Sequence, residues 1–102
     1  MKYQMQDGTV VDTDKSPQHW EEDTNWDGNN HISVATGSQW EHQTLYRSRN
    51  GRYYTVHKSQ WQGSLPHAEW VSEHEAARWL LANGHEDEMP ADLESLIDAV
   101  SE

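Results

Sequence analysis

A run of oxygen-bearing side chains at residues 23–28 has the spacing of a metal-binding loop. The sequence Asp-Thr-Asn-Trp-Asp-Gly fits the first half of the calcium pattern D-x-[DN]-x-[DN]-G. Asp23, Asn25 and Asp27 would offer oxygens at alternate positions, as Ca²⁺ requires. The twelfth position, however, is Val34 where a bidentate glutamate is needed. The three residues are therefore a weak calcium candidate, and a loop held by Asx-turns is favoured.

The seven histidines raise the question of zinc or acid–base catalysis. His67 and Glu69 would share one face if their segment is a strand, but no spacing specifies the three ligands that catalytic zinc usually needs. The chain has no nucleophile motif and no glycine-rich phosphate loop. We expect a protein that is not an enzyme and uses no cofactor. A small hydrolase with a His/Glu site at His67 is a lesser alternative.

The six tryptophans have two interpretations. Trp20, Trp26, Trp40, Trp61 and Trp70 lie in or beside polar segments, where exposed rings could stack on a sugar or anchor a protein partner. Together with the loop at residues 23–28 they would make a ligand-binding module for sugar or calcium. The alternative is a core without phenylalanine, and we expect at least three of the six in that core. The safest core assignment is the sixth, Trp79.

Charge is distributed very unevenly. Four of the seven basic residues lie in the acid-free segment 45–58, while the whole chain carries a net charge of −11. Arg49 and Arg52 should flank a turn as cross-strand neighbours, and Arg47 should lie opposite Tyr54. These arginines could pair with acids of the same chain or form an anion or partner site, and internal pairing is favoured.

The acidic excess argues against a broad nucleic-acid-binding surface, because that affinity depends on Lys and Arg displacing counterions. Solubility is the simplest explanation of the charge. The same charge could attract proteins whose basic clefts bind DNA. The residues expected to meet such a partner are Glu86, Asp87, Glu88, Asp92, Glu94 and Asp98, with Arg49 and Arg52.

Length and composition predict one domain spanning residues 1–102. No cysteine is present, which excludes disulfides and thiolate chemistry. No apolar run approaches the roughly 20 residues that span a bilayer, and the first residues do not have the pattern of a signal peptide. We therefore expect a cytoplasmic protein without membrane contact.

The strand signals begin with a hairpin at residues 2–12, where Asp7-Gly8 would be a two-residue turn. A short helix is expected at residues 18–22, a loop at 24–30 and a weak strand at 31–36. The carboxylates of residues 21–23 should form a solvated run.

The strongest hairpin signal covers residues 43–58, around Asn50-Gly51. This pair favours a type I′ turn, which would place Leu45 opposite Val56. A bulge in the turn would swap the two faces. A final short strand is expected at residues 67–71.

Two helices should follow the strands. Ser72 and Glu75 form a capping box at the start of the first, which should run to about Asn83. Its expected apolar stripe is Ala77, Leu80 and Leu81. Pro90 should open the second, in which apolar residues are spaced at i, i+3, i+4 and i+7. The predicted fold is α+β: a small antiparallel sheet of about four or five strands with two C-terminal helices packed on one face.

The segment 44–54 and the later Glu73-His-Glu-Ala-Ala-Arg-Trp-Leu80 resemble a loose group of small acidic bacterial proteins. These share a Leu-Tyr-Arg…Gly-x-Tyr hairpin and a Glu-Ala-x-x-Trp-Leu helix, and they are accessory proteins of phages, plasmids and integrative elements. The resemblance implies a setting without an activity.

Combined with the charge, this setting favours a non-enzymatic protein-binding protein. The specific expectation is a mobile-element inhibitor of a nucleic-acid-handling host system, of the DNA-mimic or anti-defence type. Its partner would be a protein with a basic surface, such as a DNA-binding or CRISPR protein.

Overall fold

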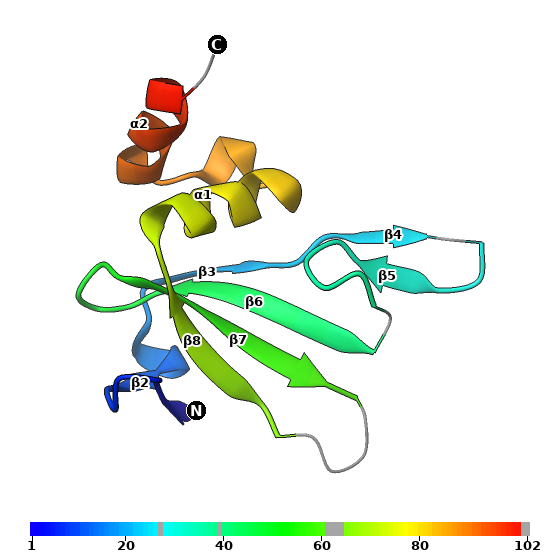
Figure 1. The fold of residues 1–102 in the computed structure, drawn as a ribbon, viewed down its shortest axis with the longest axis horizontal. Helices are drawn as coiled ribbons and strands as arrows, with labels where there is room; N and C mark the ends of the chain where they lie inside the picture. The colour runs from blue at the N-terminus through cyan, green and yellow to red at the C-terminus, as the bar shows by residue number, and fades with distance from the viewer. Residues whose placement is uncertain (27, 39, 61–64, 101–102) are drawn as a thin grey trace.

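A four-stranded antiparallel sheet forms the centre of the computed structural model. The structure describes residues 1–26, 28–38, 40–60 and 65–100, and for residues 98–100 it describes the backbone alone. The strand order is β3-β6-β7-β8. The strands are β3 (Gln18–Glu21), β6 (Glu41–Arg47), β7 (Tyr53–Ser59) and β8 (His67–Val71) (Figure 1).

Two short hairpins and two helices surround this sheet. The first hairpin pairs β1 (Lys2–Gln4) with β2 (Val10–Asp12), and the second pairs β4 (Thr24–Trp26) with β5 (His31–Ser33). The helices are α1 (Glu73–Ala82) and α2 (Ala91–Val100), and two 3₁₀ turns are η1 (Thr13–Lys15) and η2 (Glu86–Glu88). The predicted α+β class with C-terminal helices is confirmed.

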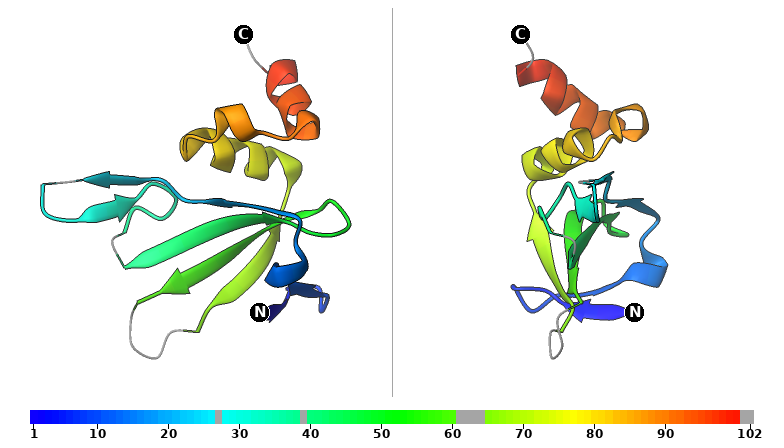
Figure 2. Two further views of the ribbon diagram at one scale, coloured as in Figure 1. Left: turned by 180° about the vertical axis from the view of Figure 1, so that it is seen from behind. Right: turned by 90° about the vertical axis from the view of Figure 1, so that its right-hand side faces the viewer.

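Alternation along β6 and β7 gives the sheet two buried faces. On one face, Leu45 and Tyr53 pack with Trp20 against the helices. On the other face, Tyr54 and Val56 pack against the N-terminal hairpin. The right-hand view of Figure 2 shows the helices above the sheet and this hairpin below it. The sheet is therefore covered on both sides, whereas the sequence predicted cover only from the helices.

The β6–β7 connection is a three-residue loop, so the predicted register was wrong. The Ser48 N–H donates to the Arg52 carbonyl over 2.7 Å, and Leu45 lies opposite Thr55. A type I′ turn needs positive φ at both central residues. Here Gly51 has φ +83°, while no non-glycine residue of the described chain has positive φ. One additional residue in the loop shifts β7 by one position, so each β7 side chain points to the opposite face from the one predicted. In this register Tyr53 lies on the same face as Leu45, and both are buried under the helices.

Residues 18–21 and 24–26 form strands where a helix and a loop were expected. Residues 18–21 are β3, in which Trp20 lies opposite Leu45 and is only 5% exposed. Residues 24–26 are β4, paired with β5. Local signals favoured the helix start after Ser16-Pro17, but burying Trp20 against the sheet requires an extended backbone.

The N-terminal hairpin predicted at residues 2–12 is confirmed, but the two-residue turn expected at Asp7-Gly8 is wrong, because the loop has three residues. The Met5 N–H donates to the Thr9 carbonyl over 2.7 Å, which leaves Gln6, Asp7 and Gly8 in the loop. The Gln6 side-chain amide attaches this loop to β8. Its Oε1 accepts from the Trp70 N–H at 3.0 Å, and its Nε2 donates to the Trp70 carbonyl at 3.4 Å.

Helix α1 begins at the predicted capping box. The Ser72 hydroxyl accepts from the Glu75 N–H over 3.1 Å and donates to the Glu75 carboxylate over 3.1 Å. Ala77 and Leu80 are fully buried as predicted, but Leu81 is 39% exposed and lies outside the core. Helix α2 contributes the fully buried Leu93 to the same core cluster.

Candidate functional site

The carboxylates expected to bind a partner lie along the helical layer. Glu86, Asp87 and Glu88 form η2 between the two helices, and Asp92 and Glu94 follow in the first turn of α2. All five residues are exposed, and together they are called the acidic helical face. Asp98 also belongs to α2, but its side chain lies outside the described residues.

Asp92 differs from its neighbours because it attaches α2 to the sheet. It accepts hydrogen bonds from the Tyr53 hydroxyl at 3.1 and 3.3 Å and lies 3.8 Å from the Arg47 guanidinium. Burial, followed by the negative charge of Asp92, raises the pKa of Tyr53 to about 12. Arg47 lies opposite Tyr53 and not Tyr54, and its guanidinium carbon is 5.5 Å from the Tyr53 ring centre.

The remaining acids of this face have fewer interactions with the rest of the chain than Asp92 has. Glu88 lies 3.2 Å from the His85 ring. Within the described part of the chain, Glu86, Asp87 and Glu94 form no ion pair. The structure thus places five of the predicted acids in η2 and in the first turn of α2, and three of them are exposed without an ion pair to a described residue.

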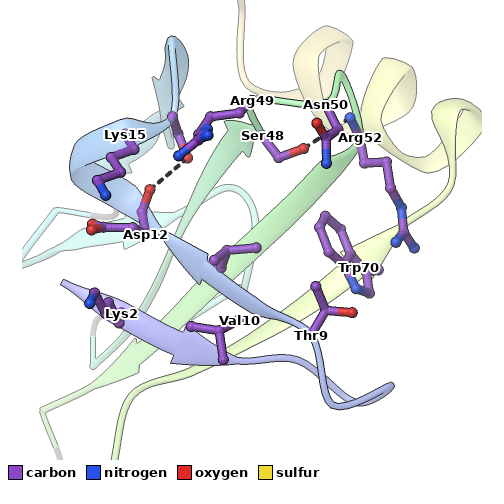
Figure 3. A pocket seen from close by; sticks show the side chains of 12 residues that line it. Lys2, Thr9, Val10, Asp12, Lys15, Ser48, Arg49, Asn50, Arg52 and Trp70 are labelled. Carbon is purple, nitrogen blue, oxygen red and sulfur yellow. Dashed lines mark hydrogen bonds between the residues drawn. The ribbon is translucent and has the colours of Figure 1, made fainter.

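Arg49 and Arg52 lie at a different part of the molecule. They are not cross-strand neighbours, because Arg52 pairs with Ser48. Both line a cavity of about 360 Å³, together with Lys2 and Lys15 from the N-terminal segment. Figure 3 shows the four side chains around this cavity. Lys2, Lys15, Arg49 and Arg52 are called the basic pocket.

Arg52 is held in place from two sides. Its guanidinium carbon lies 3.8 Å from the Trp70 ring centre, a cation–π contact, and its nitrogen lies 3.7 Å from the Asp7 carboxylate. The pKa of Asp7 is lowered, mainly by hydrogen bonding to Thr9 and further by Trp70 and Arg52. Arg47 and Arg52 therefore form the internal pairs that the sequence favoured, whereas Arg49 forms none with any described residue.

The Glu22 carboxylate is largely shielded from water and connects three strands, a role that the sequence did not predict. The sequence predicts a solvated run of carboxylates at residues 21–23, yet the Glu22 side chain is only 11% exposed. Its carboxylate accepts from the Ser33 hydroxyl and the Gln43 N–H, and it contacts the His42 ring. Trp20 could have indicated this position. Residues two apart in an extended chain lie on the same side, so Glu22 follows the buried Trp20 on that side.

The Ser33–Glu22–His42 cluster is not arranged as a catalytic triad. In a catalytic triad the histidine lies between serine and carboxylate and accepts the serine proton. Here the carboxylate lies between them, so the Ser33 hydroxyl donates to Glu22 and makes no hydrogen bond to the His42 ring. The cluster therefore links β5 and β6 to the end of β3.

The His67 site has the predicted strand geometry. The His67 ring lies 3.9 Å from the Glu69 carboxylate and stacks on His57 with ring centres 5.0 Å apart. The side chains of His67 and Glu69 are 58% and 63% exposed, so water solvates the pair. Among the described residues, no group of three or more His, Asp or Glu side chains could hold a metal ion.

The segment proposed to bind calcium has strand β4 at residues 24–26. Asp23 accepts from the Thr24 N–H over 2.9 Å. Asn25 lies within β4, opposite Ile32. Asp27 lies outside the described residues. A strand does not wrap its oxygens around a cation, so the observed part gives calcium no support.

The tryptophans divide between core and surface. Trp20 is buried, and Trp70 and Trp79 are partly buried against the two core clusters. Trp26 and Trp40 are 61% and 43% exposed. Trp61 lies outside the described residues. Trp26 stands on the β4–β5 hairpin, which projects beside the main sheet in Figure 1.

Across the residues that can be described, no helix is both long and apolar enough to cross a membrane.

Comparison with known proteins returned no match to a family model, to a curated protein or to a solved structure.

Proposed function

We propose that the chain is a non-enzymatic protein-binding protein whose acidic helical face docks on a basic surface of its partner. The observation that carries this proposal is the separation of charge. Glu86, Asp87 and Glu94 are exposed and form no ion pair within the described chain, while four of the seven basic residues line the basic pocket, away from the helical layer.

The class of partner follows from the same charge pattern. A face of closely spaced carboxylates suits a cleft built to hold the phosphates of DNA. A nuclease, a CRISPR effector or another DNA-binding protein has such a cleft. The resemblance of residues 44–54 and 73–80 to mobile-element proteins supports an inhibitor of a host defence system, acting in the cytoplasm.

The test compares two triple variants with equal charge. In the first, Glu86→Gln, Asp87→Asn and Glu94→Gln remove the three free charges of the acidic helical face. In the second, Asp14→Asn, Glu21→Gln and Glu69→Gln remove three exposed charges elsewhere. Asp92 is left intact because it attaches α2 to the sheet.

Each protein is immobilised and exposed to host lysate, with and without competing duplex DNA. The proposal predicts that the wild type and the second variant retain a DNA-binding protein that DNA displaces, and that the first variant loses it. Retention by the first variant, or recovery of no DNA-binding protein by the wild type, would contradict it.

One observation favours a second candidate, the tryptophan-based sugar-binding module. Trp26 is 61% exposed on the β4–β5 hairpin, with its ring centre 5.0 Å from that of His31. Exposed aromatic faces can stack on sugar rings. A glycan panel read by tryptophan fluorescence, with Trp26→Ala as the comparison, should then show a response that this variant loses.

A further inference from the structure

We propose that the basic pocket binds a phosphate dianion, either free or as the monoester of a small molecule. This site is separate from the acidic helical face. Its four cations come from two segments far apart in sequence, Lys2 and Lys15 at one end and Arg49 and Arg52 at the β6–β7 turn. The fold brings them together around one cavity (Figure 3).

Most of the positive charge in this pocket is not neutralised by the protein. The chain has 18 acidic residues, yet Lys2, Lys15 and Arg49 form no ion pair with any described residue. Cations in so acidic a chain have many possible carboxylate partners. Three that converge on a cavity without direct ion pairs leave a positive potential there.

Among the residues that the structure describes, Asp12 is the only carboxylate that lines the cavity. It accepts from the Asp14 N–H at 3.0 Å and from the amino group of Met1 at 3.4 Å. The Asp14 N–H is the main cause of its lowered pKa, with the amino terminus and Lys15 adding to it. Asp12 is thus already engaged, and the lining residues keep a net positive charge.

The chemistry of the lining fits a phosphate group attached to an organic part. A phosphate monoester carries close to two negative charges and three strong acceptor oxygens, and the guanidinium of Arg49 can donate two parallel hydrogen bonds to it. Val10, which is 59% exposed, and Trp70 supply apolar surface beside the cations. The volume of about 360 Å³ is that of a small-molecule site.

A nucleic acid strand fits less well than a small ligand. A strand would continue beyond the pocket onto a surface that is acidic, including Asp7 and Asp14 at its border. Those charges would repel every additional phosphate, because affinity for nucleic acid grows with the number of phosphates that cations neutralise.

The test is calorimetric titration of the whole chain with four probes: inorganic phosphate, a nucleoside 5′-monophosphate, sulfate and a single-stranded oligonucleotide. We expect saturable 1:1 binding of phosphate or the monophosphate. The monophosphate should bind more tightly if the apolar wall contributes, and equally if the free anion is the ligand. Lowering the pH from about 7.5 to about 5 should weaken phosphate binding, as its second pKa is near 6, and should leave sulfate largely unaffected.

Arg49→Ala removes an exposed side chain without an ion pair, so the fold should be retained. Because charge-assisted hydrogen bonds are strong, this change should weaken binding about tenfold or more. The matched control is Arg78→Ala, an exposed arginine of α1 with the same loss of charge. Equal weakening in both variants, absence of binding, or tighter binding of longer oligonucleotides would each overturn the proposal.

Discussion

At the scale of single residues, the Glu22 carboxylate connects three segments of the described chain. It joins the end of β3 to Ser33, His42 and Gln43. Glu22→Ala would leave the buried Ser33 hydroxyl and the partly buried Gln43 N–H without an acceptor, and a buried group without its partner costs about 1–3 kcal/mol. We expect the free energy of unfolding to fall by about 2–4 kcal/mol in urea denaturation.

The adjacent Glu21 provides the control for this prediction. Its side chain is exposed, so Glu21→Ala should change stability by less than about 0.5 kcal/mol. Equal effects of the two substitutions would show that the buried contacts of Glu22 contribute little.

Tyr53 gives a prediction on pH. Its folded-state pKa is raised from 10.0 to about 12 by burial and by the charge of Asp92. The folded state therefore disfavours the phenolate, and this contribution to stability is complete below about pH 10 and is lost as the pH rises through about 12.

The measurement is the free energy of unfolding between these two pH values in the wild type and in Tyr53→Phe. Part of the decline should disappear in the variant, which has no hydroxyl to ionise. Other buried tyrosines titrate in both proteins, so the difference between the two curves isolates Tyr53. Parallel curves would count against the assignment.

At the scale of the elements, the β6–β7 loop depends on Gly51. With φ at +83°, this position disfavours any side chain other than asparagine or aspartate. Gly51→Ala should destabilise the protein by about 1–2 kcal/mol, measured as a lower denaturation midpoint, and Gly51→Asn should cost less. If alanine and asparagine were equally tolerated, the strain would lie elsewhere.

Elements with strong local signals could be predicted, and those that depend on distant partners could not. The capping box at Ser72 and the hairpin at residues 2–12 are local, and both are confirmed. Residues 18–21 have no local strand signal, since their strand character comes from Trp20 packing against Leu45. The hairpin register depended on one φ angle at Asn50, which the sequence does not determine.

At the scale of the whole molecule, net charge should limit stability. A chain at −11 repels itself when folded, and salt screens that repulsion. We expect the melting temperature to rise between low salt and about 0.2 M NaCl. A gain of about 1 kcal/mol would correspond to roughly 4–8 °C for a domain of this size. A falling melting temperature would mean that ion pairs such as Arg52–Asp7 outweigh the repulsion.

A candidate site whose residues are neighbours in the sequence could be predicted more fully than one whose residues come from distant segments. The acids at residues 86–94 are neighbours in the chain, so composition alone located them. The basic pocket is not continuous, because Lys2 and Lys15 meet Arg49 only through packing of the N-terminal hairpin beneath the sheet. Arg49 and Arg52 were identified from sequence, but the two lysines that complete their surroundings carried no signal.

The bond between Gln6 and Trp70 has a consequence for self-association. β8 is an outermost strand of the sheet, and an unpaired strand border can recruit a strand from another copy and begin a fibril. The Gln6 amide imitates a backbone peptide and occupies both the N–H and the carbonyl of Trp70. Gln6→Ala should therefore shorten the lag of thioflavin-positive aggregation at equal protein concentration. In the wild type, the Gln6 side chain would then hinder the addition of a strand from another copy at β8.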